Sequence, residues 1–208
     1  MIDDLKNILS RVRDLYRKYG IKSITMDDVA TELGISKKTL YQYVTDKDDL
    51  VGKYIDYEIE LRQEEICKCF NIGFNAIEEL FEISGFMNKM MRDQNPATEH
   101  DLRKYYPHYY QKTIKTRRER MYYYILSNLR KGKEEELYRD DMDEEIIAKL
   151  YLSRSENTHF NELFTIEEFT SLKLFTELLI YHVRGIATDK GILVLEKKIK
   201  ELETDNKK

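Results

Sequence analysis

Residues that interrupt helices or cross-link a chain are scarce in this sequence. Its 208 residues include 2 prolines, 8 glycines and 2 cysteines, and no tryptophan. An all-β protein needs many turns, which depend on proline and glycine, so this shortage favours helices. No segment has the roughly 18 consecutive apolar residues that a membrane-spanning helix needs. The chain begins Met-Ile-Asp-Asp, without the basic and then apolar order of a secretory signal, so we expect a cytoplasmic protein.

Groups that could bind a metal or perform catalysis are equally scarce. Cys67 and Cys69 are two residues apart in a helical pattern, where their side chains diverge, so we expect reduced thiols. The sequence contains no Cys/His zinc box, no nucleophile beside a base and no glycine-rich phosphate loop. We therefore expect no metal site, no cofactor and no catalytic residues, and we do not expect an enzyme. The histidines are scattered: His100, His108, His159 and His182.

Total charge does not point to a nucleic-acid partner. The formal net charge is −4, and the first 50 residues contain nine basic and nine acidic side chains. Phosphate contacts depend on where basic side chains gather, not on the total. A nucleic-acid surface must therefore be sought in the local placement of charge.

Near the N-terminus, the sequence predicts two long helices with two short helices between them in chain order. Apolar residues recur at helical spacing over residues 5–19, and Gly20 is placed to end that helix. A later helix is predicted to begin at Thr45 and Asp46 and to continue to about residue 70. No flexible linker interrupts it, so this helix is expected to connect the N-terminal part to the rest of the chain.

The segment between these helices predicts a helix-turn-helix. Thr25, with Asp28 three residues later, has the spacing of a capping box that opens a helix, and Gly34 ends it. Ser36 is placed to cap a third helix over about residues 37–44. Two short helices joined by a glycine-containing turn are the arrangement that enters a DNA groove.

These patterns predict an all-α fold, with an N-terminal helix-turn-helix three-helix unit and a C-terminal helical bundle, about nine or ten helices in total. Residues 1–48 are expected to form the DNA-binding domain, and residues 49–208 a helical ligand-binding and dimerisation domain. The connecting helix spans about residues 46–70. Further expectations are a loop at residues 132–136, a helix capped by Asp143, and one long helix over about residues 166–187.

The outward face of the third helix is the clearest candidate site. Its side chains can all form hydrogen bonds and none is acidic, although the segment as a whole is neutral. A locally positive face of this kind suits contact with phosphates and base edges. The residues are Lys37, Lys38, Thr39, Tyr41, Gln42 and Tyr43.

The residues from Ile24 to Ala30 and from Gly34 to Leu50 resemble the DNA-binding domain of the tetracycline-repressor (TetR) family. Residues 137–143 and 184–188 resemble, more weakly, loops beside the dimerisation helices of that family. The resemblance implies a homodimeric transcription regulator, expected to be a repressor, that binds pseudo-palindromic duplex DNA. A small-molecule effector is implied, and no membrane partner.

The resemblance also assigns roles to residues of the helix-turn-helix. Thr25, Ser36, Lys37 and Lys47 would contact phosphate. The third helix would supply the remaining contacts, to base edges from Lys38, Thr39 and Gln42, and to phosphate or a thymine methyl group from Tyr41 and Tyr43.

The middle of the chain is rich in rings with polar tips, and the sequence has 16 tyrosines in all. Packing explains most such residues, but a pocket for an apolar or aromatic ligand uses the same side chains. The candidate pocket residues are Phe74, Phe86, Met90, Tyr110, Met121 and Tyr124.

The last long helix is apolar on more than one side and therefore needs cover from two directions. We expect it to form a four-helix dimer interface with the helix that follows Asp143. The candidate interface residues are Ile146, Ile147, Leu150, Leu172, Phe175, Thr176, Leu179 and Val183.

Two function hypotheses remain open at this point. The first is a repressor released from its operator by a small apolar or aromatic ligand. The alternative is a dimeric DNA-binding regulator that needs no ligand and is controlled by a protein partner.

Overall fold

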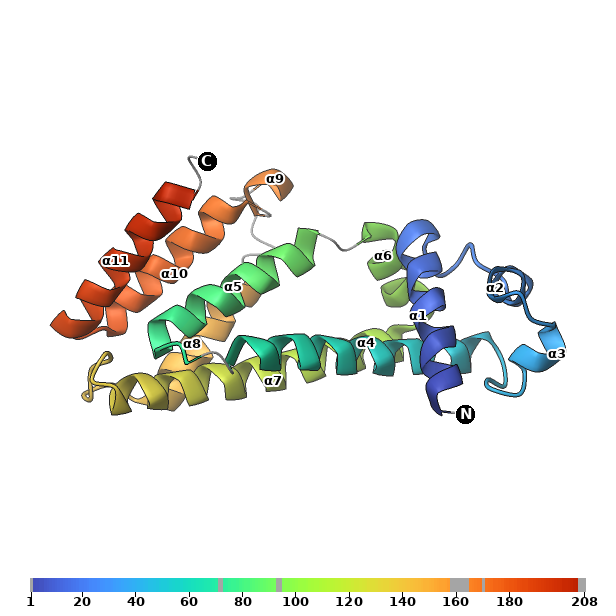
Figure 1. The fold of residues 1–208 in the computed structure, drawn as a ribbon, viewed down its shortest axis with the longest axis horizontal. Helices are drawn as coiled ribbons and strands as arrows, with labels where there is room; N and C mark the ends of the chain where they lie inside the picture. Colours follow the sequence, from blue (N-terminus) through green and yellow to red (C-terminus); the bar gives the residue numbers. More distant parts are fainter. Residues whose placement is uncertain (1, 71–72, 93–94, 158–164, 170, 206–208) are drawn as a thin grey trace. The chain divides into compact units, whose positions relative to one another are not determined.

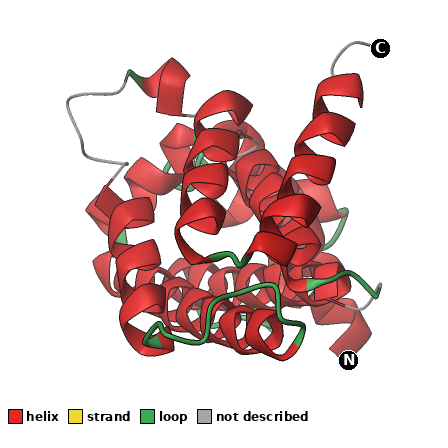
Figure 2. Ribbon diagram, turned by 90° about the vertical axis from the view of Figure 1, so that its left-hand side faces the viewer, coloured by secondary structure: helices red, strands yellow, loops and turns green. Residues whose placement is uncertain are grey.

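The computed structural model describes residues 2–70, 73–92, 95–157, 165–169 and 171–205, and these are almost entirely helical (Figures 1 and 2). Extended pairing within this part is limited to one isolated bridge between Tyr138 and Ala187. The prediction of an all-α fold with an N-terminal helix-turn-helix is confirmed. None of the described helices is long and apolar enough to cross a bilayer.

The helix boundaries follow in chain order. They are α1 (Ile2–Tyr19), α2 (Met26–Leu33), α3 (Lys37–Leu40), α4 (Lys47–Phe70), α5 (Ala76–Arg92), α6 (Pro96–Tyr105), α7 (Pro107–Glu134), α8 (Glu144–Asn157), α9 (Ile166–Phe169), α10 (Leu172–Ile186) and α11 (Asp189–Asp205).

The chain packs as two compact units. The N-terminal unit consists of Met1–Glu65 and Asp93–Thr116, and the C-terminal unit of Ile66–Arg92 and Arg117–Lys208. Thus α6 and the beginning of α7 belong to the N-terminal unit, although they are distant from the helix-turn-helix in sequence. The functional division at residue 48 stays a prediction.

The core of the N-terminal unit is built from the inward faces of α1 to α4. Val12, Leu40 and Leu50 are fully buried there. The rings of Tyr16 and Tyr54 meet edge to face, with their centroids 5.1 Å apart, a favoured aromatic geometry. Burial raises the pKa of both phenols, so they stay neutral.

Polar side chains of α6 and its cap dock on the C-terminal end of α1, beside which α6 lies in Figure 1. Asn95 Nδ2 donates to the carbonyl of Arg17 at 2.8 Å, and Thr98 Oγ1 donates to the carbonyl of Tyr16 at 2.6 Å. The bond to Arg17 supplies an acceptor near the helix end with a partner, and the bond to Tyr16 adds a second donor to a carbonyl that also accepts the N–H of Gly20 at 2.9 Å. α6 therefore acts as a cap for α1 from outside the helix-turn-helix.

The core of the C-terminal unit lies between α5, α7, α8, α10 and α11, and it contains a buried polar group of side chains. Asn128 Nδ2 donates to the carbonyl of Ala76 at 2.8 Å, and the Tyr138 hydroxyl donates to Asn128 Oδ1 at 3.2 Å. Lys131 pairs with Glu79, which is also buried. Because each of these polar groups has a partner, the network ties α5, α7 and the segment after α7 together.

The segment after α7 pairs with the end of α10. The N–H of Arg139 donates to the carbonyl of Ile186 at 2.9 Å, and the N–H of Thr188 donates to the carbonyl of Leu137 at 2.9 Å. The two downstream segments that the sequence singled out, 137–143 and 184–188, therefore lie side by side in the fold.

Several helix boundaries differ from the predicted ones for local reasons. Residues 166–187 do not form one helix, because Ser171 caps a new one by accepting the N–H of Leu174 at 3.2 Å. The loop expected at residues 132–136 begins later, since α7 continues through Gly132 to Glu134. The third helix ends as α3 at Leu40 and continues only as turns to residue 43. The predicted cap at Asp143 is confirmed, because its Oδ1 accepts the N–H of Ile146 at 3.0 Å.

Candidate nucleic-acid interface

The helix-turn-helix begins at a capping box. The side chain of Thr25 accepts the N–H of Asp28 at 3.2 Å, and the carboxylate of Asp28 accepts the N–H of Thr25 at 2.7 Å. These hydrogen bonds lower the pKa of Asp28. At the other end of α2, Gly34 has a φ of 67°, in the left-handed region that favours glycine. The predicted start and end of this helix are confirmed.

α3 is oriented by a second cap and one buried side chain. Ser36 Oγ accepts the N–H of Thr39 at 3.0 Å, and the two hydroxyl oxygens are 2.8 Å apart. Leu40 is completely buried. With that face fixed inward, Lys37, Lys38 and the following residues Tyr41 and Gln42 are exposed. The other two residues of the predicted DNA face, Thr39 and Tyr43, are half-buried.

The two lysines of α3 differ in their surroundings. Lys37 Nζ pairs with Asp27 on α2 at 3.0 Å, and this hydrogen bond raises the pKa of the lysine. Lys38 has no carboxylate within ion-pair distance among the described residues. Lys38 is therefore the more available of the two for an anionic partner, a distinction that sequence spacing does not reveal.

Lys47 lies at the first turn of α4, beside the loop that joins α1 to α2. Its Nζ donates to the carbonyl of Lys22 at 3.3 Å. Partial burial lowers the pKa of Lys47, and the nearby charge of Lys22 lowers it further. Among the described residues, neither lysine has a carboxylate within ion-pair distance, although Asp101 and Asp28 act on Lys47 from farther away. Two neighbouring cations at a helix start favour an anion such as phosphate.

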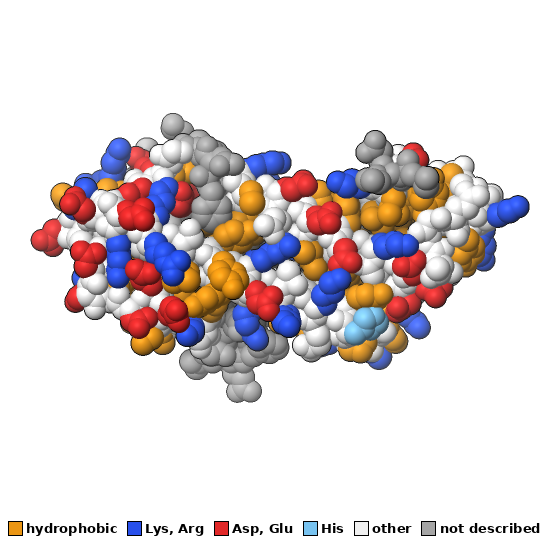
Figure 3. Space-filling view, turned by 90° about the horizontal axis from the view of Figure 1, so that it is seen from below, with side chains coloured by type: hydrophobic (Ala, Val, Ile, Leu, Met, Phe, Trp, Pro, Cys, Tyr) orange, Lys and Arg blue, Asp and Glu red, His pale blue; other side chains and the backbone are white. Residues whose placement is uncertain are grey.

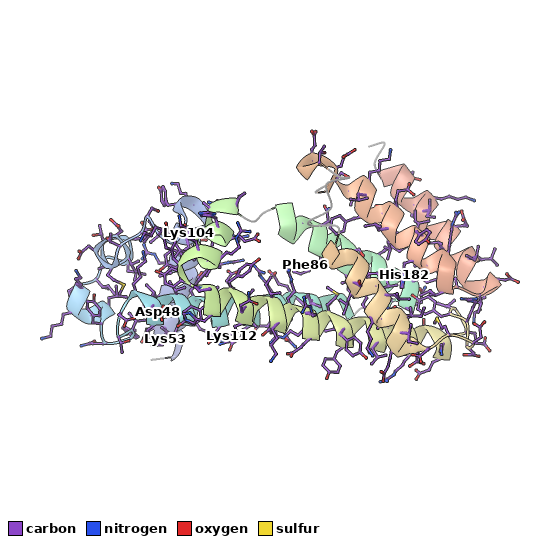
Figure 4. The ribbon with its side chains drawn as sticks, turned by 180° about the vertical axis from the view of Figure 1, so that it is seen from behind. Asp48, Lys53, Phe86, Lys104, Lys112 and His182 are labelled. Carbon is purple, nitrogen blue, oxygen red and sulfur yellow. The ribbon has the colours of Figure 1, made fainter. Side chains whose placement is uncertain are left out.

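Tyr43 is positioned through its backbone as well as its ring. The ring packs against the core of the N-terminal unit, and its carbonyl accepts a hydrogen bond from Lys53 Nζ at 2.7 Å. The same ammonium contacts Asp49 Oδ2 at 2.9 Å. Sequence reasoning did not identify Lys53; the only signal was its i, i+4 spacing from Asp49, which is common on helix surfaces. Asp48, Lys53 and Lys112 are labelled near the beginnings of α4 and α7 in Figure 4.

The candidate pocket residues are divided between the two units. Tyr110 packs against the core of the N-terminal unit, whereas Met121 packs against that of the C-terminal unit. Tyr124 also belongs to the C-terminal unit, where burial and the neighbouring thiol of Cys67 raise its pKa. Phe74 and Phe86 are half-buried, and Phe86 lies on α5 (Figure 4). The side chain of Met90 lies outside the described residues.

The candidate dimer residues fall into exposed and buried groups. Ile146, Leu150 and Leu172 are exposed in the single chain. Ile147, Phe175 and Thr176 are half-buried. Leu179 and Val183 are buried in the core of the C-terminal unit, so their assignment to a dimer surface is corrected here. Both lie on the side of α10 that its own unit covers.

Sequence comparison identifies the family of this helix-turn-helix. Residues 8–54 match the profile of "Bacterial regulatory proteins, tetR family". The HTH-type transcriptional regulator YvaF of Bacillus subtilis (strain 168), described as uncharacterized, is 33% identical over 102 residues. Residues 8–54 are thus a tetR-family helix-turn-helix region. The alignment with YvaF covers 49% of this chain and 53% of YvaF, so this chain matches about half of that relative.

Solved structures extend the likeness in fold beyond this region, to most of the chain. A transcriptional regulator from Cytophaga hutchinsonii superposes with a TM-score of 0.76 at 18% identity, covering 89% of this chain and 99% of that one. A γ-butyrolactone receptor superposes with a TM-score of 0.61 at 15% identity, covering 95% and 94%. At these identities the likeness concerns the fold alone. The family profile contains every residue assigned above to DNA contact, from Thr25 to Lys47.

Proposed function

We propose that this tetR-family chain is a transcription regulator whose dimer binds a pseudo-palindromic duplex. The exposed side of the recognition turn, defined as residues 37–43 (α3 and the turn after it), carries this proposal. Lys38, Tyr41 and Gln42 project from it beside a helix-turn-helix whose two caps are both formed. Two such turns, one from each chain, would enter successive major grooves.

Each residue of the proposed DNA contact has a role that fits its surroundings. Lys38, Thr39 and Gln42 would contact base edges, because amide, hydroxyl and ammonium groups match the donors and acceptors of the major groove. Tyr41 and Tyr43 would contact phosphate or a thymine methyl group. Phosphate would also be held at the helix starts, by Thr25, Ser36, Lys37 and Lys47.

The dimer would form through α8 and α10. Ile146 and Leu150 are large apolar side chains 55% and 60% exposed on α8, and Leu172 is 46% exposed at the start of α10. Large apolar side chains that stay exposed in the single chain are candidates for an oligomer surface. Ile147, Phe175 and Thr176 would extend the contact at its margin.

A small apolar or aromatic effector would regulate DNA binding. The proposal is supported by the likeness to the γ-butyrolactone receptor and by half-buried rings on helices of the C-terminal unit, such as Tyr124 and Phe86. To release DNA, the effector must bind the free and DNA-bound forms with different affinity, since equal affinity shifts no equilibrium. Control by a protein partner without any ligand is the competing outcome.

Selection of bound duplexes from a random pool tests DNA binding directly. We expect enrichment of a pseudo-palindrome whose half-sites lie about one helical turn apart. Lys38→Ala should weaken binding to that sequence by about 1–3 kcal/mol. Lys47→Ala should weaken binding to every duplex and lower the slope of log affinity against log salt by about one.

No enriched sequence, together with variants that bind as the parent does, would contradict the proposed function. A thermal-shift screen of apolar and aromatic compounds separates the two forms of regulation. A compound that stabilises the protein and weakens operator binding supports the effector. Operator binding that responds only to a second protein favours the partner.

A further inference from the structure

Three side chains form hydrogen bonds to the backbone where the recognition turn joins α4. Asp46 Oδ1 accepts the N–H of Asp49 at 2.8 Å, and Asp49 Oδ2 accepts the N–H of Thr45 at 2.8 Å. Lys53 Nζ reaches back to the carbonyl of Tyr43 at 2.7 Å. The first two bonds form an ordinary helix start, but the third links α4 to the end of the recognition turn.

The Tyr43 carbonyl is a favourable site for a cation. Tyr43 ends the turns that follow α3, whose last helical residue is Leu40. A carbonyl outside a helix needs a donor from elsewhere, and the ammonium of Lys53 supplies one. Asp49 holds the same ammonium at 2.9 Å from its other side. Lys53 is therefore fixed between a backbone carbonyl and a carboxylate.

This link is more sheltered than other lysine–carboxylate pairs of the N-terminal unit. The side chains of Lys53 and Asp49 are 36% and 30% exposed, against 48% and 53% for Lys112 and Asp56. Burial alone would raise the pKa of Asp49, but the hydrogen bonds from Lys53 and Thr45 outweigh it and lower the pKa. The carboxylate stays ionised and keeps the ammonium in place.

The held carbonyl lies next to the residues proposed to contact DNA. Tyr41 and Gln42 are exposed, and the chain is anchored directly after them by the half-buried Tyr43 and by Val44, which is 2% exposed. Ser36 fixes the beginning of the recognition turn, and Lys53 fixes its end. A shift of about 1 Å between contacting groups is enough to weaken a hydrogen-bonded site substantially.

From these contacts we infer that Lys53 is a positioning residue of the DNA interface: it sets the pose of Tyr41 and Gln42 against α4 without touching DNA. This inference rests on the proposed function and deepens it, because it names a determinant of specificity outside the recognition turn. It makes Lys53 a residue whose loss should affect the preferred sequence more than duplexes in general.

The test compares Lys53→Met with Lys112→Met, which removes an equal charge and an ion pair from the same unit without touching the recognition turn. Affinity for the selected operator and for an unrelated duplex is measured over a salt series, and folding is followed by thermal unfolding. We expect Lys53→Met to weaken operator binding about tenfold, the range of a lost specific contact. The affinity of Lys53→Met for an unrelated duplex should equal that of Lys112→Met.

Lys53→Arg provides the rescue. A guanidinium has several donors, so it can serve both the Tyr43 carbonyl and Asp49, and operator affinity should remain within about twofold to threefold of the parent. Asp49→Asn is the second variant. It removes the ion pair that holds the ammonium of Lys53, so it should also lower the preference for the operator over an unrelated duplex.

Each other outcome overturns the inference. Equal operator binding by Lys53→Met and Lys112→Met would remove any positioning role. Equal weakening on both duplexes, with a salt slope lower by about one than that of Lys112→Met, would make Lys53 a phosphate contact. If Lys53→Met does not fold, unchanged preference in Asp49→Asn decides against the inference. A parent protein that binds no duplex would instead refute the proposed function.

Discussion

Gly132 shows how one backbone position can determine the packing of a whole loop. It is buried in α7, and a Cβ built there would fall inside the ring of Tyr138. Tyr138 is itself 1% exposed and bonded to Asn128. The ring therefore lies directly on the helix backbone, which only glycine permits at this point.

Gly132→Ala should lower the free energy of unfolding. Alanine normally stabilises a helix by about 1 kcal/mol over glycine, but overpacking a rigid ring costs about 1–3 kcal/mol and here should exceed that gain. Urea unfolding monitored by circular dichroism measures the difference. The matched control is Gly185→Ala in α10, where a Cβ would have no neighbour within 4 Å. That control should be neutral or stabilising, and a stabilised Gly132→Ala would contradict the packing.

The pairing of Lys37 leads to a second prediction at this scale. Asp27 holds the ammonium of Lys37 at 3.0 Å, and both side chains are well exposed. Asp27→Asn would free that charge, so binding to any duplex should strengthen and the salt slope should steepen by up to about one. Asp56→Asn removes an equal charge from the exposed pair with Lys112 and serves as the control. Identical salt slopes for the two variants would exclude a phosphate contact at Lys37.

At the scale of elements, α6 completes the N-terminal unit. Asp101 is 9% exposed, and its Oδ2 accepts the N–H of Lys22 at 2.7 Å, directly after α1. With the bonds from Asn95 and Thr98, this places the support of the α1–α2 loop on a helix about 80 residues later in the chain. A substitution in α6 that loosens this loop should therefore also shift Thr25, which follows the loop, and Lys47, which donates to it.

Asp101→Ala should leave the Lys22 N–H without its acceptor and cost about 1–3 kcal/mol of stability. Hydrogen exchange should localise the loss to the amide of Lys22 and the end of α1. Glu99→Ala, at an exposed position of the same helix, is the control and should leave exchange unchanged. Equal protection of Lys22 in both variants would show that the carboxylate does not hold the loop.

For the whole molecule, exposure separates the proposed dimer surface from the core on the same helices. In the view of Figure 3, charged side chains of both signs are interspersed with apolar ones. Apolar exposure alone is common on proteins, so the assignment to α8 and α10 depends on large side chains such as Leu150, 60% exposed, and not on Leu179, 3% exposed.

Leu150→Arg should therefore dissociate the proposed dimer and leave each chain folded, because arginine at an exposed position is solvated. Leu179→Arg should unfold the C-terminal unit, since it would bury an unpaired charge at a cost of several kcal/mol. Sedimentation and circular dichroism distinguish the two results. A Leu150→Arg protein that remains dimeric would place the interface elsewhere.

The sequence by itself determined the helical class, the helix-turn-helix and its boundaries at Thr25, Gly34 and Ser36. Helix caps and apolar periodicity involve residues close together in sequence, so the helices that they define can be predicted from the local pattern. The same patterns could not show that Lys53 reaches the Tyr43 carbonyl or that α6 supports α1, because these contacts join residues by where their helices lie in space. Nor could they decide which side of α10 is interior. A helix apolar on two sides fits either orientation, and only the packing of α5 and α11 around it buries Leu179 and Val183.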